Sequence, residues 1–489
     1  MRKYFIIFVT IILAANNSFA QYDSIVNNFQ NDFDQFKQSI EQEHQQFKNK
    51  NDSVFAKFLK DSWQEFDVFY NEKEVQPKPS IQPVLKESQQ RETPIQKITP
   101  ADSSQSNISE LIKIEYILEN KKLPKERNNS GRAMMHFDFY GTETSTFRLE
   151  RLPQLSEITA KTISSFFENT CNNKNVIELV DELKTKKNTL LLNDWGYYKL
   201  VEKAAQKIEP STQIQTLLTW EILLKSGYNV KVGYSAHDVF LMLPTKQEIF
   251  SSYYLTINDV QYYIQTNRDK DQPLPRLKIH TANFPGNERL SLQLKQLPLL
   301  GEQEISKKIE FNDVVFNVTQ PQSLKTFYAD YPLCDMVVCF FAPLSEQARK
   351  SLDKIFIPLF DSKTERQKVS VLLEFVQSAF PYKTDKEQFG TEKYFFPDEI
   401  FFYPFSDCED RSVLFCSLVK YFTGLDCIAL DFPGHINTAV CLPGNPKGDY
   451  LALAGKNYTV CDPTYKNAPV GYLDTQYKKQ KPKIITFEK

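Results

Sequence analysis

Cys408, His435 and Asp462 are the residues of this sequence whose types and spacing could carry out nucleophilic chemistry. They follow one another at equal steps of 27 residues within the last 82 residues of the chain. A thiolate is a strong nucleophile, an imidazole can accept the thiol proton, and a carboxylate can orient the imidazole. The three residues therefore suit acyl transfer through a thioester on Cys408, with water or an amine as the acceptor.

The patterns around these residues predict the elements that would position them. An apolar run follows Cys408 and stops at Gly424, so we expect a helix that begins at the cysteine. Unpaired N–H groups and the positive end of the helix dipole favour a thiolate there, and the Cys408 N–H could bind an oxyanion. His435 opens a strand after a Pro-Gly turn, and Asp462 ends a later strand just before Pro463. We therefore expect His435 as base and Asp462 as the acid that orients it.

Two acidic residues beside the cysteine carry charge of the wrong sign for a thiolate. Glu409 and Asp410 lie in the first turn of the expected helix, where they complement its dipole. Their negative charge opposes an ionised thiol on Cys408. We therefore expect His435 to supply the compensating positive charge.

These motifs resemble the transglutaminase-like superfamily, whose papain-like core uses Cys, His and Asp in this order, at a helix start and on two strands. Asp407-Cys408-Glu409-Asp410 is most similar to bacterial exported transglutaminase-like proteins, including their predicted cysteine peptidases, and Asp462-Pro463-Thr464 is typical of the family. The resemblance covers about residues 345–475. The sequence departs from many members at Glu409 and Asn437, where they carry tryptophan and another aromatic residue.

The resemblance implies an α+β protein with a C-terminal transglutaminase-like, papain-like domain, in which Cys408 is the nucleophile, His435 the general base and Asp462 the orienting acid. It implies a cysteine peptidase or amidase acting on protein or peptide substrates. We favour hydrolysis over transamidation because water is always available as an acceptor. The alternative is a catalytically inactive binding or scaffold protein of the cell envelope that keeps the same fold.

Composition limits the class of protein without identifying a function. The 489 residues are enough for about three domains at roughly 100–200 residues each. A formal net charge of −2 offers no basic footprint, so we expect no nucleic-acid partner. The eight cysteines are too few for a disulfide-built scaffold, no His/Cys cluster has metal-ligand spacing, and the sequence has no glycine-rich phosphate loop. We therefore expect no metal and no cofactor.

Residues 1–20 have the pattern of a secretory signal peptide, with two basic residues, an apolar run from Tyr4 to Ala15, and small residues at Ser18 and Ala20. The alternative is a membrane anchor, but the run is shorter than the roughly 20 residues that a spanning helix needs. The later sequence contains no stretch apolar enough to span a bilayer. We expect an exported protein, periplasmic or secreted, without a transmembrane span after cleavage.

The next two segments predict a helical arm and a linker. Residues 21–71 have apolar side chains at helical spacing, with a second helix running from Phe55 to Tyr70, and together predict an amphipathic arm. The two helices would pack on each other or on the body; alternatively, the arm serves self-association or docking of a partner. Residues 72–108 are rich in Pro and Gln and predict an extended, mobile linker.

The body that follows divides into three parts. Residues 109–272 have mixed helix and strand patterns and predict an α+β domain. Residues 273–343 predict a β-rich domain or insert, with strands at Leu290–Leu294 and Val314–Val318. Residues 344–489 form the expected transglutaminase-like catalytic domain.

A degenerate second copy of the C-terminal pattern can be laid over residues 211–265. Ser211 would stand in the place of the thiol, His237 would be a relic of the catalytic histidine, and Gln265 would replace the aspartate. On this interpretation residues 109–272 contain an inactive transglutaminase-like repeat that binds or scaffolds. The alternative is a generic helix followed by a hairpin, of the kind that many α+β domains contain.

Overall fold

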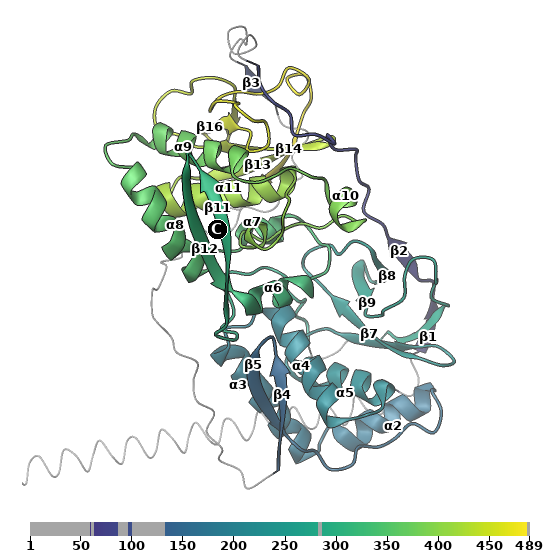
Figure 1. Ribbon diagram of the computed structural model, residues 1–489. Coiled ribbons are helices and arrows are strands. Elements are labelled where there is room, and N and C mark those ends of the chain that lie inside the picture. The colour runs from purple at the N-terminus through teal and green to yellow at the C-terminus, as the bar shows by residue number, and fades with distance from the viewer. Residues whose placement is uncertain (1–58, 60–62, 87–95, 100–132, 282–285, 487–489) are drawn as a thin grey trace, which may run out of the picture.

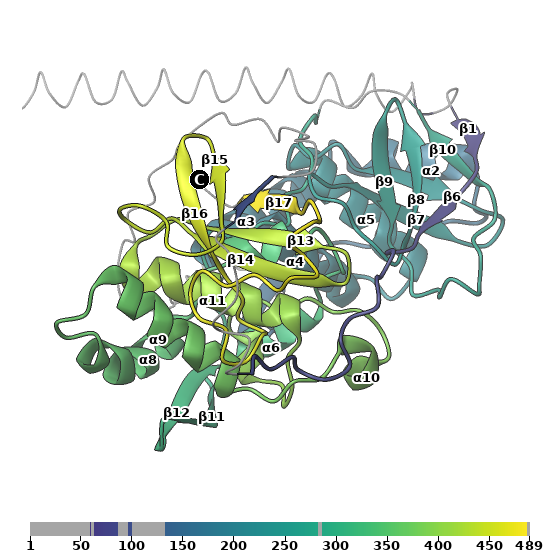
Figure 2. The ribbon, with the colours of Figure 1, turned by 90° about the horizontal axis from the view of Figure 1, so that it is seen from above.

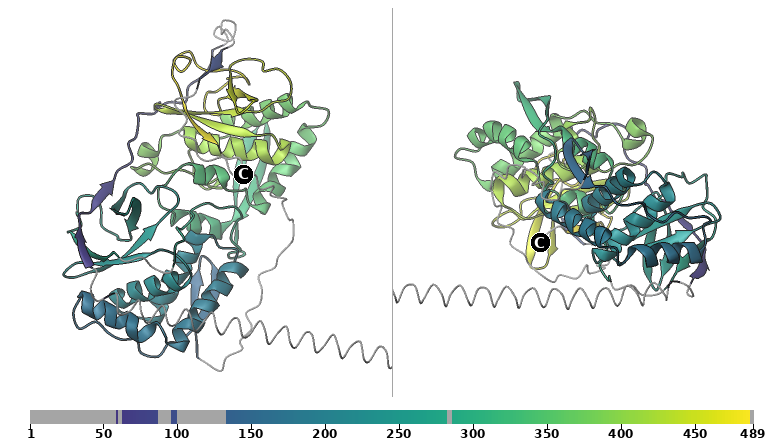
Figure 3. Two further views of the ribbon diagram at one scale, coloured as in Figure 1. Left: turned by 180° about the vertical axis from the view of Figure 1, so that it is seen from behind. Right: turned by 90° about the horizontal axis from the view of Figure 1, so that it is seen from below.

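Two large sheets organise this mixed α+β chain, seen in a computed structural model that describes Leu59 and residues 63–86, 96–99, 133–281 and 286–486. The first sheet and its helices occupy one end of the molecule, and the second sheet and its helices occupy the other (Figures 1 and 3). None of the described helices is long and apolar enough to cross a membrane. The expected signal peptide and most of the expected helical arm lie outside the described residues.

The first sheet has seven strands in the order β1-β10-β6-β7-β9-β8-β2, and each neighbouring pair is antiparallel. In chain order its strands are β1 (Trp63–Phe66), β2 (Phe69–Asn71), β6 (Lys231–Tyr234), β7 (Val239–Pro244), β8 (Ser252–Ile257), β9 (Val260–Ile264) and β10 (Leu277–His280). Within the described residues, the helices that precede β6 are α2 (Ala160–Thr170), α3 (Lys174–Thr189), α4 (Asp194–Ile208) and α5 (Thr212–Lys225). Helix α5 is apolar on nearly all sides because it lies between α4 and β7.

The second sheet has six strands in the order β17-β13-β14-β16-β15-β3. In chain order its strands are β3 (Lys97–Ile98), β13 (Cys427–Phe432), β14 (His435–Val440), β15 (Tyr450–Leu453), β16 (Lys456–Cys461) and β17 (Lys483–Thr486). Its neighbours are antiparallel except β3, which runs parallel to β15. Helix α11 (Cys408–Thr423) lies along this sheet against β13 and β14, as Figure 2 shows from above.

The remaining elements connect the two sheets or pack beside them. Two hairpins are separate from the large sheets: β4 (Met134–Phe139) with β5 (Thr142–Phe147), and β11 (Glu304–Phe311) with β12 (Val314–Pro321). The further helices are α6 (Gln322–Ala329), α7 (Val337–Phe341), α8 (Glu346–Leu359), α9 (Glu365–Ser378), α10 (Asp385–Phe389) and the 3₁₀ turn η2 (Glu399–Phe401). Helix α9 packs against α11 on the side away from solvent, and its Leu372 and Val376 are fully buried.

The two large sheets share one strand order when β1 is set aside. Each has a helix before its central hairpin, α5 before β6-β7 and α11 before β13-β14, and the next two strands extend the sheet in the same sequence. The pairs Tyr234↔Val239 and Phe432↔His435 close the two hairpins. Val239 therefore has the register position of His435, and the expectation that His237 has it is wrong. His237 lies exposed in a four-residue loop, because this hairpin loop is longer than the Pro-Gly turn before His435.

Two other expectations about the N-terminal part differ from the structure. The expected second arm helix is wrong for residues 63–71, which form β1 and β2 at opposite edges of the first sheet. Trp63 packs edge-on against Tyr234 and His280, and this tertiary contact overrides the local helical spacing. The described parts of the expected mobile linker are extended but packed, since Leu85 and Ile98 are buried against the second sheet and its loops.

The expected strand Leu290–Leu294 is also wrong. Only an isolated bridge joins Leu290 to Thr245, although Leu290, Leu292 and Leu294 are all fully buried. The alternation of buried and less buried side chains is real, but it accompanies an extended segment without a continuous ladder. The other expected strand, Val314–Val318, lies within β12.

Candidate active site

Cys408 is the first residue of α11, as the sequence predicts. Asp407 caps the helix, and its N–H donates to an Asp410 carboxylate oxygen at 3.1 Å, which completes a capping box. The helix ends at Gly424, whose φ of 67° is left-handed. The Cys408 side chain is fully buried. Local sequence therefore fixes where the thiol stands, and tertiary packing closes it off from solvent.

His435 and Asp462 lie together beside this helix. The register of β14 and β16 pairs Thr438 with Cys461, so Asp462 emerges from β16 next to the start of β14. His435 Nε2 is 2.9 Å from Asp462 Oδ2, and both side chains are almost completely buried. The N–H groups of Thr464 and Tyr465 donate to the other oxygen of Asp462 at 2.9 and 3.0 Å, which fixes the carboxylate.

The surroundings of His435 favour its charged form. Burial alone lowers the pKa of His435, but the charge and hydrogen bond of Asp462 outweigh it and raise this pKa above its usual value. The Asn437 side-chain amide also lies 3.0 Å from Nε2, oriented so that its nitrogen donates to Asp462 Oδ2 at 2.6 Å. Tyr477 stacks on the imidazole at a centroid distance of 5.2 Å. The ring is held firmly, and its Nδ1 has no hydrogen-bond partner.

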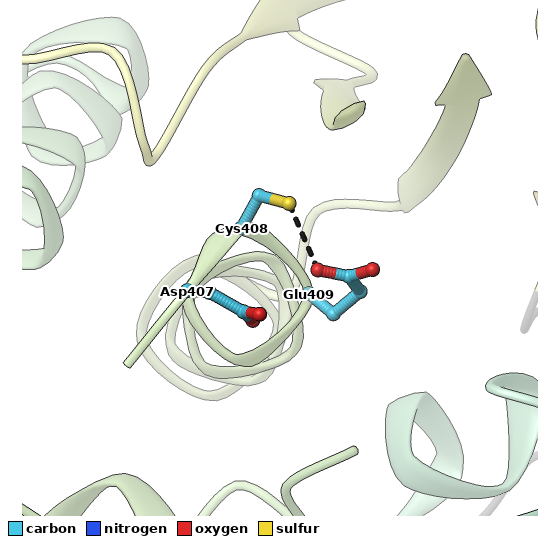
Figure 4. A group of neighbouring side chains, drawn as sticks. All are labelled: Asp407, Cys408 and Glu409. Carbon is cyan, nitrogen blue, oxygen red and sulfur yellow. Dashed lines mark hydrogen bonds between the residues drawn. The ribbon is translucent and has the colours of Figure 1, made fainter. Parts of the chain in front are cut away.

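The thiol itself is bonded to a carboxylate in this state. Cys408 Sγ donates to Glu409 Oε2 at 2.8 Å, the contact drawn in Figure 4. Burial and the charges of Glu409 and Asp407 raise the pKa of the thiol well above its usual value. Helix α11 does pack on the histidine strand, since Ser412 Oγ donates to the Ile436 carbonyl. The structure thus brings His435 and Asp462 into contact, while Cys408 is hydrogen-bonded to Glu409 and not to His435.

Lys78 is the functional-site residue that the sequence does not predict. Its ammonium lies 2.8 Å from Asp407 and Glu392, 2.9 Å from Glu409 and 3.9 Å from Asp385. Lys78, and not His435 alone, therefore supplies positive charge beside the thiol. The only sequence signal for it is indirect, because the carboxylates that flank the cysteine require a counter-charge from somewhere in the chain.

Among the residues that the structure describes, two groups of side chains have the spacing of metal ligands. They are Asp407, Cys408 and Glu409, and Asp385, Asp407 and Asp410, with ligand atoms within 4.8 Å of one another in each group. Burial raises the pKa of Asp407 to about 7 and of Asp385 to about 9, with neighbouring carboxylates adding to the effect. Buried carboxylates at this spacing need protons or a cation. The Lys78 ammonium already serves both groups.

We call the first sheet with its helices the first unit, and the second sheet with its helices the second unit. The first unit has a cavity at the place that corresponds to Cys408 and Asp462 in the second. A cavity of about 250 Å³ lies at the start of α5 and is lined mainly by amide and hydroxyl side chains, among them Thr212, Gln215 and Gln265. The Gln265 N–H donates to the Leu241 carbonyl, so this glutamine leaves β9 as Asp462 leaves β16. The expectation that Ser211 takes the place of the thiol is wrong at the helix start, because Ser211 is the N-cap and Thr212 is the first residue of α5, as Cys408 is of α11. The first unit therefore has a polar cavity where the second has its thiol and carboxylate.

Comparison with known proteins yields no relative for this chain. No family model matches it, and neither the curated proteins nor the solved structures contain a match.

Proposed function

We propose that this protein is a transglutaminase-like cysteine hydrolase or acyltransferase that acts on peptides or proteins. The observation that carries the proposal is the buried His435–Asp462 pair, which has an unpartnered Nδ1 and lies at the start of the strand against which the helix that begins at Cys408 packs. A base oriented by a carboxylate and a thiol on the adjoining helix are the groups that nucleophilic catalysis needs. The shared burial of all three side chains supports their acting as one unit.

The reaction follows from these roles. His435 takes the proton of the Cys408 thiol, and the thiolate attacks the carbonyl carbon of an amide, with helix N-terminal N–H groups facing the oxyanion. The tetrahedral intermediate collapses to a thioester, and the leaving amine takes the proton from the imidazolium. Water, deprotonated by His435, then attacks the thioester and releases an acid and the free thiol. An amine in place of water gives transamidation by the same steps.

The proposal includes the place of the protein and the role of its first unit. The pattern of residues 1–20 supports export, to the periplasm or outside the cell. The shared strand order of the two large sheets supports residues 211–265 as an inactive repeat. This repeat has Thr212 and Gln265 where the catalytic copy has Cys408 and Asp462. We propose that it scaffolds the catalytic unit or binds a ligand.

A second candidate is an inactive binding or scaffold protein, and one observation favours it. Glu409 accepts the hydrogen bond of the Cys408 thiol and raises its pKa, which opposes formation of the nucleophile. A relative that has lost its activity could keep such a contact, because nothing selects against a neutral thiol. The two candidates differ in the reactivity of Cys408 once solvent reaches it.

Alkylation with iodoacetamide, followed residue by residue by mass spectrometry, separates the candidates. We expect Cys408 to react below pH 8 and faster than the buried core cysteines Cys416 and Cys461. His435→Ala should slow Cys408 at least tenfold, while the matched change His280→Ala, which lies in the first sheet, should leave its rate unchanged. The proposed enzymatic function would be refuted by equal rates of Cys408 alkylation in the unchanged protein, His435→Ala and His280→Ala. A Cys408 that is disulfide-bonded in purified protein would refute it as well.

A further inference from the structure

A single extended segment crosses the candidate active site. We name residues 76–85 the strap; it is part of the dark trace that runs from β2 past α10 towards β3 in Figure 1. Although it lies more than 300 residues earlier in the sequence, it contacts residues within two positions of each of the three proposed catalytic residues. These contacts make the strap more than a connection between the two sheets.

The strap meets each flank through a different group. Lys78 binds Asp407 and Glu409, the residues on either side of Cys408. The Pro77 carbonyl lies so close to Gly434, the residue before His435, that a Cβ there would be 2.5 Å from the carbonyl oxygen.

Past the lysine, the strap binds mostly through its backbone. The side-chain amide of Gln82 donates to the Thr464 carbonyl at 3.0 Å, two residues after Asp462, and the contacts that follow use the strap's main chain. Tyr382 Oη donates to the Pro79 carbonyl at 2.8 Å, the Lys466 N–H donates to the Pro83 carbonyl, and the Leu85 N–H donates back to Lys466. Main-chain contacts of this kind accept many sequences, as in peptides that bind as an added strand.

Lys78 is the strap residue whose side chain is placed in a charged pocket. Only 7% of this side chain is exposed, and its ammonium faces Asp385, Glu392, Asp407 and Glu409. One oxygen each of Asp385 and Asp407 is buried without a hydrogen-bond partner. A structural ion pair needs one carboxylate, whereas four surround this ammonium. Their oxygens leave hydrogen-bond acceptors beside the bound cation that are not fully used.

We propose that these four carboxylates form a subsite for the lysine side chain of an extended peptide substrate, and that the strap is its intramolecular occupant. The proposal rests on the proposed function, since it assigns that site its substrate class. The bound lysine is recognised and is not the acyl acceptor, because the carboxylates raise its pKa and hold it protonated despite burial. Lys78 is also followed by Pro79, and the resulting tertiary amide is a rigid, extended link suited to an occupant.

The subsite also has a chemical consequence for the nucleophile. The carboxylates of Asp407 and Glu409 oppose ionisation of Cys408, and the Lys78 charge counteracts them. When the strap leaves, a substrate lysine restores that positive charge next to the thiol. Binding of a substrate lysine then selects the substrate and, at the same time, offsets the negative charges of Asp407 and Glu409.

Peptide binding tests the subsite without depending on catalysis. The host is the full chain with Cys408→Ala and with residues 76–85 replaced by ten Gly and Ser residues, which leaves β1, β2 and β3 intact. The probe is a fluorescent peptide with the strap sequence Gln76–Leu85, and its matched control carries methionine in place of the lysine. We expect the lysine peptide to bind and the methionine peptide to bind at least about 30-fold more weakly, as loss of a buried charge partner predicts.

Three further results decide the proposal. The Cys408→Ala chain with its own strap should not bind the peptide, and Asp407→Asn with Glu409→Gln in the host should abolish the preference for lysine. The proposed subsite is refuted by equal binding of both peptides or by no binding of the lysine peptide at millimolar concentration. Tighter binding of Ca²⁺ than of the peptide refutes it as well. In the strap-replaced chain with its native thiol, an inert Cys408 refutes the proposed function alone, since peptide binding is measured independently.

Discussion

Gly434→Ala tests the contact between the strap and the turn before His435, the proposed base. Gly434 follows Pro433 in the two-residue turn before His435, and its φ of 75° together with the preceding proline is typical of a type II turn. An alanine Cβ at this position would lie 2.5 Å from the Pro77 carbonyl oxygen. Since both partners are backbone atoms or rigidly attached to backbone, the strap has to move away.

Gly424→Ala is the matched control. Gly424 also has a positive φ, 67°, but a Cβ there meets nothing within 4 Å. Both variants carry the same left-handed strain of about 1 kcal/mol, so the strain cancels in the comparison. Only Gly434→Ala adds an overlap, for which about 1–3 kcal/mol is typical. This cost exists only while the strap is docked, so it shifts the strap towards its open state by about 5- to 150-fold.

Hydrogen exchange measures that shift directly. The Leu85 and Lys466 N–H groups close the hydrogen-bonded pair between the strap and the loop after Asp462. We expect both amides to exchange about 5- to 150-fold faster in Gly434→Ala than in Gly424→Ala, and Cys408 to be alkylated faster by a similar factor. Equal protection of Leu85 in the two variants would show that the strap does not rest on Gly434, and the reasoning would fail.

Three further changes test other parts of the structure. Lys78→Met leaves buried carboxylates without their cation and should weaken strap docking by about 3–5 kcal/mol, seen as faster exchange at Leu85; a loss below about 1 kcal/mol contradicts the pocket. Asp462→Asn removes the charge that holds the pKa of His435 up against burial, so NMR titration should show a lower pKa and alkylation of Cys408 should slow by about 10³-fold. Burial raises the pKa of Asp398 to about 6, so its stabilising contribution is present below about pH 4 and is lost as the pH rises through 6. Asp398→Asn should therefore reduce the fall in unfolding free energy between pH 4 and 7 by about 3 kcal/mol in urea titrations, and an unchanged fall would contradict this assignment.

The elements that carry the candidate triad could be predicted because their signals are local. An apolar run that follows Cys408 and stops at Gly424 predicts a helix that begins at the cysteine, and α11 begins there. A Pro-Gly turn predicts that His435 opens a strand, and β14 does begin at this residue. Pro463 predicts that the strand ends at Asp462, and β16 ends one residue earlier, at Cys461. Each signal lies within a few residues of the side chain it positions.

The charged half of the site could not be predicted, because its partners are remote in sequence. Lys78 is 329 residues from Asp407, in a segment whose Pro and Gln content is typical of a linker. Composition indicates the conformation of such a segment alone in water. It does not reveal that the segment binds buried carboxylates from a remote part of the chain. The same reason explains β1, where helical spacing at Trp63 gives way to pairing with β10. The bond from Cys408 to Glu409 likewise depends on burial, which spacing does not reveal.

The path of the strap follows from the arrangement of the two units. Strands β2 and β3 pair with β8 and β15, which hold corresponding places in the two sheets. The chain between them must pass from the edge of one sheet to the edge of the other, and residues 76–85 cross the candidate site on the way. Because β2 and β3 are paired in their sheets, the strap, as the proposed occupant, competes for the carboxylates at an effective concentration on the order of millimolar. A peptide in solution must bind tightly enough to displace the strap from this effective concentration. We therefore expect the docked strap to be the resting state, and we expect the contacts of the peptide's lysine to determine whether the peptide binds.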